Sequence, residues 1–186
     1  MQKRTRGIGL AFIVLFVSAT LVNAAGDAPR EIAEKAASRL GRELSEALMT
    51  AMTNKGPSAA IDVCAKQAPA FVGQIEKDLG VTIKRTALKI RNPQNAPDTV
   101  ECNLLQKLTA AKQAGETLPR GVTPFPGTQR RFYKIITAQP TCLPCHGDSA
   151  MMSERVRREI AVTYPDDQAT GYVDGDLRGI ISVLVK

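Results

Sequence analysis

Apolar residues recur at every fourth position along residues 27–55, with Arg, Glu and Lys between them. The recurring positions are Ile32, Ala36, Leu40, Leu44, Leu48 and Met52. This spacing places the apolar side chains along one face of an α-helix. Asp27 can act as the N-cap, Pro29 suits a first turn that needs no backbone N–H, and Gly56 follows the last turn. We therefore expect one long helix over residues 27–55.

A second helical pattern follows over residues 57–80. Proline lacks a backbone donor, so Pro69 predicts a break or kink within this stretch. Further along the chain, Asp98 and Glu101 have the spacing of a capping box. They predict the start of a third helix, which ends at Gly115.

β-Branched residues mark three expected strands, over residues 81–90, 132–137 and 179–185. The apolar phase of the first strand changes after Ile83, which indicates a bulge or an early end. A short basic helix is expected over residues 152–162, between the last two strands. Strands that follow helices through long connections are typical of an α+β domain with an antiparallel sheet. The chain length suits a single domain.

The first 24 residues have the pattern of a secretory signal peptide. Three cations within the first six residues precede an apolar run over residues 8–22, and small residues follow up to Ala24. We expect cleavage after Ala24, which leaves residues 25–186 in the periplasm without stable membrane insertion. Retention of the apolar run as an anchor is the alternative. Cleavage lowers the net charge from +7 to about +4, which fits a soluble protein or an acidic partner. The chain has no Trp, which argues against nucleic-acid binding by base stacking.

Cys142-Leu143-Pro144-Cys145-His146 matches C-x-x-C-H, the attachment pattern of c-type haem. On a helical turn, residues three and four apart share one face. The two thiols can therefore meet the two vinyl groups of one porphyrin edge, while the imidazole reaches the iron. His146 is the one His of the chain, and export supplies a matching compartment. We expect one covalent haem c, bonded to Cys142 and Cys145 and ligated by His146.

Three other uses of the motif are possible. A thioredoxin-like dithiol would follow an early strand of a βαβ unit, whereas this motif lies late in a chain without that pattern. A zinc site needs four ligands, and only Cys142, Cys145, His146 and one distant Cys could contribute. A disulfide within the motif would leave His146 unexplained. We favour haem attachment over these three uses.

The second axial ligand must be Met, Cys, Lys, water or nothing, because the chain has no second His. Met151 and Met152 follow His146 too closely to reach the opposite face of the haem easily, and we expect them near the porphyrin rim. Met49 and Met52 belong to the apolar face of the first helix, where core packing is expected.

Cys64 and Cys102 are the remaining candidates. In an oxidising compartment, two spare cysteines can instead form a disulfide with each other. Composition alone leaves both alternatives open.

Four segments together resemble one known family. They are AIDVC at 60–64, RTALKIRNPQNAPD at 85–98, CLPCHG at 142–147 and GDLRGIISV at 175–183. The chain resembles the Tll-like family of exported single-haem c-type cytochrome domains, found alone or at the sensing end of membrane signalling proteins. The resemblance extends over about the whole mature chain. It implies a PAS-like fold and a haem iron held by His146 and Cys64.

The implied thiolate ligand suggests a role. A thiolate stabilises ferric iron and lowers the reduction potential. Reduction weakens the bond between iron and thiolate, so NO or CO could bind at the opened position and the helix that carries Cys64 would move. We therefore expect redox or gas sensing, or electron transfer with a partner protein, by a monomer or weak oligomer. The alternatives are an electron carrier with a Met or open sixth position, and a peroxidase-like enzyme. We expect no catalysis, because the chain lacks a second His for distal acid–base chemistry.

Haem propionates require cations or hydrogen-bond donors when partly buried. Arg85 and Arg91 border the Asn-Pro loop and are candidates, with solvated surface charge as the alternative. Arg155, Arg157 and Arg158 indicate an exposed basic helix face that could dock an acidic electron donor.

Overall fold

The structure is a computed structural model that describes residues 24–123 and 131–186. Its helices are α1 (Ala24–Lys55), α2 (Pro57–Asp62), α3 (Ala68–Leu79), α4 (Thr99–Gln113), α5 (Leu143–His146) and α6 (Glu154–Thr163). A π-helical turn, η1 (Val63–Gln67), and two 3-10 turns, η2 (Pro93–Asn95) and η3 (Pro140–Cys142), complete the helical elements of the described residues. The strands are β1 (Val81–Thr86), β2 (Gly121–Val122), β3 (Arg131–Thr137) and β4 (Leu177–Val185).

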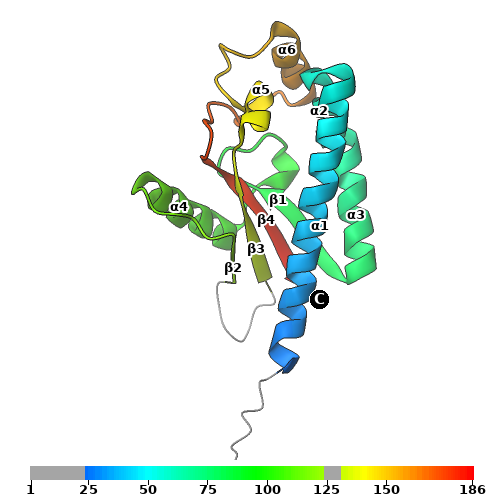
Figure 1. Ribbon diagram of the computed structural model, residues 1–186, viewed down its shortest axis with the longest axis vertical. Coiled ribbons are helices and arrows are strands. Elements are labelled where there is room, and N and C mark those ends of the chain that lie inside the picture. Colours follow the sequence, from blue (N-terminus) through cyan, green and yellow to red (C-terminus); the bar gives the residue numbers. More distant parts are fainter. Residues whose placement is uncertain (1–23, 124–130) are drawn as a thin grey trace, which may run out of the picture.

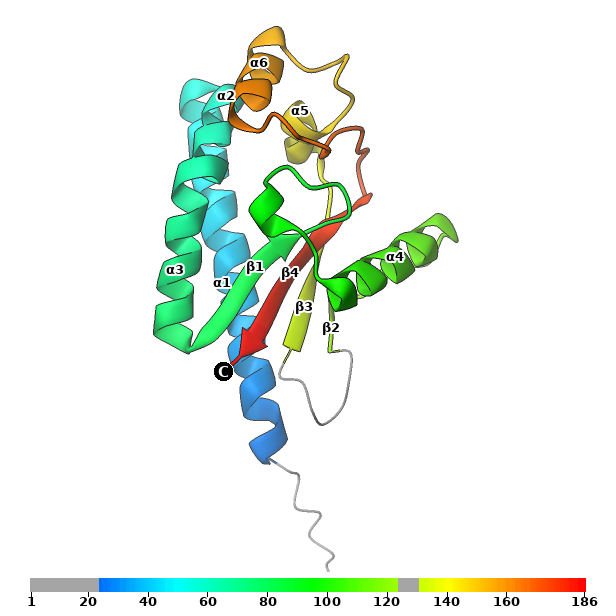
Figure 2. The same cartoon turned by 180° about the vertical axis from the view of Figure 1, so that it is seen from behind.

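The four strands form one antiparallel sheet in the order β1-β4-β3-β2. Helices α1 and α3 cover one face of this sheet and α4 lies on the other, as Figures 1 and 2 show from opposite sides. The segment that contains α5 and α6 lies beyond one end of the sheet, next to α2. The prediction of an α+β domain with N-terminal helices and an antiparallel sheet is therefore confirmed.

The long first helix forms as predicted, but its cap is not Asp27. Helix α1 already includes Ala24, and Pro29 lies inside it. Alanine is the best helix former, so Ala24 and Ala25 extend the helix beyond Asp27. The expected face of α1 is buried against the sheet, in one cluster with Ile83, Ile181 and Val183. Its contributions to this cluster are Ala33, Ala36, Ala37, Leu40 and Leu44.

The break predicted near Pro69 is present as the π-helical turn η1, which separates α2 from α3. Pro69 lies in the first turn of α3, where its missing N–H costs little. A π-helical turn accommodates one extra residue in a continuous helix and is frequent at functional sites. Cys64 lies within η1, so the irregular turn determines where its thiol points.

The remaining elements agree with the sequence pattern apart from their ends. Strand β1 ends early, at Thr86. The capping box is complete: Asp98 accepts a hydrogen bond from the Glu101 N–H, and Glu101 accepts one from the Asp98 N–H, both at 2.8 Å. Glu101 is 1% exposed and also pairs with Lys84 at 2.8 Å. The two-residue strand β2 was not predicted, because two residues carry no periodicity.

The predicted signal peptide, residues 1–24, lies outside the described residues except for Ala24. In residues 24–123 and 131–186, none of the helices has both the length and the hydropathy that crossing a bilayer requires. Export to the periplasm remains a prediction.

Gly179 is required where β4 begins, at the end of the sheet nearest to the haem-type motif. Its φ is +154°, and an added Cβ would overlap the Thr86 carbonyl oxygen of β1 and lie 3.0 Å from the Ala87 Cβ. We expect Gly179→Ala to lower the free energy of unfolding by about 3 kcal/mol, measured by urea denaturation. Gly73 is the matched control, because an added Cβ on α3 meets no atom within 4 Å. Gly73→Ala should stabilise the protein by about 0.5–1 kcal/mol. Equal effects of the two substitutions would contradict this account.

Candidate haem site

The C-x-x-C-H motif occupies two consecutive helical turns. Cys142 ends η3, and Cys145 and His146 belong to α5, which follows directly. The Cys142 sulfur lies 3.5 Å from the Gln139 N–H, and the Cys145 Sγ lies 3.8 Å from the Pro57 carbonyl oxygen at the start of α2. The motif is therefore helical, as its chemistry requires, and it faces the N-terminal helices.

Gly147 closes the helical turn of the motif, and a second segment is hydrogen-bonded to the backbone at this point. An added Cβ at this position would lie 2.7 Å from the Leu143 carbonyl oxygen, which accepts the Gly147 N–H at 2.8 Å. The Gly147 carbonyl accepts the Gly171 N–H at 2.8 Å, and the His146 carbonyl accepts the Tyr172 N–H at 3.0 Å. Residues 169–172 are thus fixed against the motif through its backbone.

His146 is held in the form that ligates a metal. Its Nδ1 lies 2.7 Å from the Ala169 carbonyl oxygen. A carbonyl only accepts, so Nδ1 carries the proton and Nε2 keeps a free lone pair. Burial, together with the positive charges of Arg178 and Arg91, lowers the pKa of His146 to about 2. The imidazole is therefore neutral, and Tyr172 supports its ring in an edge-to-face contact at 6.3 Å.

Arg91 ties this site together from the Asn-Pro loop. Its guanidinium makes a fork to Asp167 at 2.9 and 3.0 Å, with both side chains at most 10% exposed. The same group donates to the carbonyl oxygens of Cys145 at 2.6 Å and Ala169 at 3.4 Å. Arg91 therefore positions the motif and the hydrogen-bond partner of His146, so its geometry favours a role within the protein over the predicted propionate contact.

Cys64 lies close to the motif although it is far away in sequence. Burial raises the pKa of the Cys145 thiol; Arg91 opposes this shift, and charge on Cys64 and Cys142 adds to it. Ala65, next to Cys64, packs with Cys145 against a buried cluster between α2 and α6. This cluster consists of Ile61, Met152, Val156, Ile160 and Tyr164. The structure thus places the turn that carries Cys64 next to Cys145 of the motif.

Cys102 lies elsewhere. It belongs to α4, on the opposite face of the sheet from α1, α2 and η1 (Figure 1). All four cysteines are free thiols in the structure. A disulfide between Cys64 and Cys102 would have to cross the sheet, so the geometry disfavours that alternative. No cluster of three or more His, Cys, Asp or Glu side chains suited to a metal ion occurs in the described residues.

The methionines do not supply an evident ligand. Met152 is 6% exposed and packs in the cluster between α2 and α6, whereas Met151 is 85% exposed. Met49 was expected in the core, which is wrong: it is 47% exposed. Met52 is half-buried.

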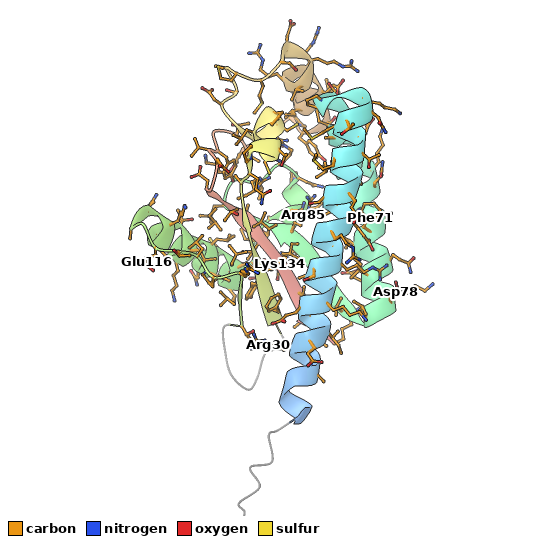
Figure 3. The ribbon with its side chains drawn as sticks, viewed as in Figure 1. Arg30, Phe71, Asp78, Arg85, Glu116 and Lys134 are labelled. Carbon is orange, nitrogen blue, oxygen red and sulfur yellow. The ribbon has the colours of Figure 1, made fainter. Side chains whose placement is uncertain are left out.

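Two further arginines surround His146. Arg85 lies on β1 behind α1 in Figure 3, at the end of the sheet toward α5. The Arg178 Nη2 lies 3.5 Å from the His146 Nε2, and its guanidinium stacks 5.1 Å from the Tyr172 ring centre. Burial lowers the pKa of Arg178, Tyr172 counteracts this, and the nearby cations Arg85 and Arg91 lower it further. In the described part of the chain, no carboxylate pairs with Arg85 or Arg178.

Sequence reasoning missed Arg178, Tyr172 and Asp167. Arg178 belongs to a segment that carries the family resemblance, and a charge at the start of an apolar strand was the available signal. Asp167 and Tyr172 lie in an irregular segment whose path no local pattern reveals. The predicted basic face of α6 is less basic than expected, since Arg155 pairs with Glu159 at 3.2 Å and Arg158 with Glu154 at 3.7 Å.

These residues fit a covalently attached haem. Two thiols lie on adjacent helical turns, a neutral imidazole has an unprotonated Nε2, and two guanidiniums that could meet propionates have no carboxylate partner in the described chain. The imidazole suits the iron of a haem, the thiols suit its vinyl groups, and the guanidiniums suit its propionates.

Comparison with known proteins agrees with this architecture. A solved structure, described as the cyanobacterial heme-protein Tll0287, is 22% identical, with a TM-score of 0.64 over 84% of this chain and 95% of that chain. No curated protein matches the chain. The model of the Tll0287-like family matches residues 19–186. The chain therefore belongs to the Tll0287-like family.

Proposed function

We propose that this protein is an exported single-haem c-type cytochrome domain. The observation that carries the proposal is the state of His146, one residue after the second thiol of the motif: its Nδ1 donates to the Ala169 carbonyl oxygen, so its Nε2 carries no proton, and only a long 3.5 Å contact from Arg178 reaches Nε2. Cys142 and Cys145 would form the thioether bonds, His146 would ligate the iron, and Cys64 would be the second axial ligand. The solved relative is itself described as a heme-protein, which supports the assignment of a haem to this chain.

The bound haem would supply one-electron chemistry at its iron and an exchangeable coordination position. The chain supplies the positions of the ligands. Arg91 and Asp167 fix the motif and, through Ala169, the orientation of the imidazole. Arg85, which no described carboxylate neutralises, would offset the charge of a propionate. Arg91 could pair with a propionate only if it gave up its ion pair with Asp167.

The location of Cys64 favours redox or gas sensing as the role. Cys64 lies in a π-helical turn, an irregularity that is frequent at functional sites. Release of Cys64 from the iron would therefore be felt in α2 and α3, which continue from η1 on either side. NO or CO would bind at the released position. Electron exchange with a partner protein is the second candidate role, and we expect no catalysis.

The ligand assignment predicts a difference between two cysteine variants. The protein would be matured in the periplasm with haem-attachment enzymes, and ferric spectra would be recorded. Cys64→Ala should change the ferric spectrum and raise the midpoint potential, because the thiolate that stabilises ferric iron is lost. Cys102→Ala is the matched control and should leave both unchanged, since it lies on α4 across the sheet. Identical behaviour of the two variants would contradict Cys64 ligation and favour a disulfide.

The gas-sensing role makes its own prediction. In the wild-type protein, CO should bind only after reduction, when Cys64 would leave the iron. In reduced Cys64→Ala, CO should bind faster, because no thiolate has to leave first. Stopped-flow absorbance would measure both rates. Fast electron exchange with a small cytochrome and no CO binding in either protein would favour simple electron transfer. Rapid peroxide turnover would instead favour an enzyme.

The two-point ion pair between Arg91 and Asp167 predicts that a single substitution of Asp167 strongly destabilises the protein. Asp167→Asn leaves the buried Arg91 without its counter-charge and should cost about 3 kcal/mol in free energy of unfolding, measured by urea denaturation. It should also broaden the ferric spectrum, because His146 is held through the same fork. Asp78→Asn is the control: it removes the exposed partner of Arg39 and should leave the denaturation midpoint unchanged. If Asp167→Asn changed neither the free energy of unfolding nor the ferric spectrum, the ion pair with Arg91 would not be what holds the site.

A further inference from the structure

A pocket of about 250 Å³ opens beside the candidate haem site, between the second half of α4 and the chain that leads into β4. Leu88, Leu105 and Leu177 line it, and Leu105 is only 1% exposed. These side chains make the interior apolar. The pocket can therefore accept a hydrocarbon stem.

The charged residues of the same pocket are mostly cations. Lys89, Lys112 and Arg178 line it, against one carboxylate, Asp176. Asp176 already accepts the Val173 N–H at 2.9 Å. In the described chain, none of the three cations forms an ion pair with a carboxylate. The pocket thus has an excess of positive charge that the protein does not neutralise.

Two of the cations, Lys89 and Arg178, are held in place by contacts that leave them able to bind an anion. Lys89 donates to the Thr170 carbonyl oxygen at 3.0 Å and lies 4.9 Å from the Tyr172 ring centre. Arg178 stacks over the same ring. An ammonium has three donors and a guanidinium five, so each of these groups retains free N–H donors.

From this combination we propose that the pocket binds a carboxylate on a short apolar stem. The charge excess selects the carboxylate, and the leucines select the stem. Two sources have this chemistry: a propionate of the attached haem, or a free short-chain carboxylic acid. The propionate source rests on the proposed function, whereas the free acid does not.

The occupant of the pocket would act on His146. Arg178 lines the pocket and also places its Nη2 3.5 Å from the His146 Nε2. Tyr172 lines the pocket and contacts the imidazole edge. A carboxylate that binds Arg178 draws the guanidinium toward the pocket and away from Nε2, so occupancy of the pocket and metal binding by His146 favour each other.

The test compares hexanoate with hexanol on the purified full-length holoprotein by isothermal titration calorimetry. A free-acid site predicts saturable binding of hexanoate and at least tenfold weaker binding of hexanol. Lys112→Gln should weaken hexanoate about fivefold, and Lys107→Gln should not. Lys107 is the matched control, since it lies exposed on the same helix outside the pocket. Calorimetry can also be performed on a protein without haem, so a colourless protein would refute the proposed function, and absence of hexanoate binding to it would overturn the carboxylate site as well.

A propionate in the pocket predicts a different result. Hexanoate would then fail to bind, and Lys112→Gln, unlike Lys107→Gln, would shift the propionate carboxylate band in infrared difference spectra on reduction and lower the midpoint potential. Either result supports a carboxylate site and identifies its source. Absence of hexanoate binding combined with identical infrared spectra and potentials of the two lysine variants would overturn the proposal.

Discussion

The fork between Arg91 and Asp167 is the interaction on which the candidate site depends. It joins the Asn-Pro loop after β1 to the segment before β4, and the same guanidinium holds the carbonyl oxygens of Cys145 and Ala169. Because Ala169 binds Nδ1 of His146, one ion pair sets the path of the chain, the position of the motif and the tautomer of the imidazole. Buried ion pairs of this kind add little net stability, but loss of one partner is costly.

A second constraint brings Cys64 to the same place. The π-helical turn η1 interrupts the helical stretch between α2 and α3. The cluster of Ile61, Met152 and Tyr164 packs α6 against α2. The segment after the motif therefore reaches back to the element that carries the proposed sixth ligand. Any movement of Cys64 must be accommodated by this packing, because protein cores deform between discrete arrangements rather than continuously.

The fold was largely predictable from local signals. The fourfold apolar repeat of α1, the capping box of Asp98 and Glu101, and the β-branched runs each depend on neighbouring residues, and each formed an element. The motif residues were predictable for the same reason, since C-x-x-C-H is local in sequence. Arg178, Tyr172 and Asp167 were not, because their roles arise from contacts between segments far apart in the chain. The exposure of Met49 was missed because periodicity gives a helix face but not which of its residues a neighbouring element covers.

The electrostatics of the site point to an anion that the protein itself does not provide. Three arginines lie near one neutral imidazole, and like charges at close range destabilise one another unless they are neutralised. Asp167 neutralises Arg91, but in the described chain no carboxylate does so for Arg85 or Arg178. A ligand with acidic groups would remove this repulsion, and the free energy of its binding would add to that of folding. Each acidic group of such a ligand would stabilise only the folded state. Ligand binding should therefore also make the Asn-Pro loop, which carries Arg91, more rigid.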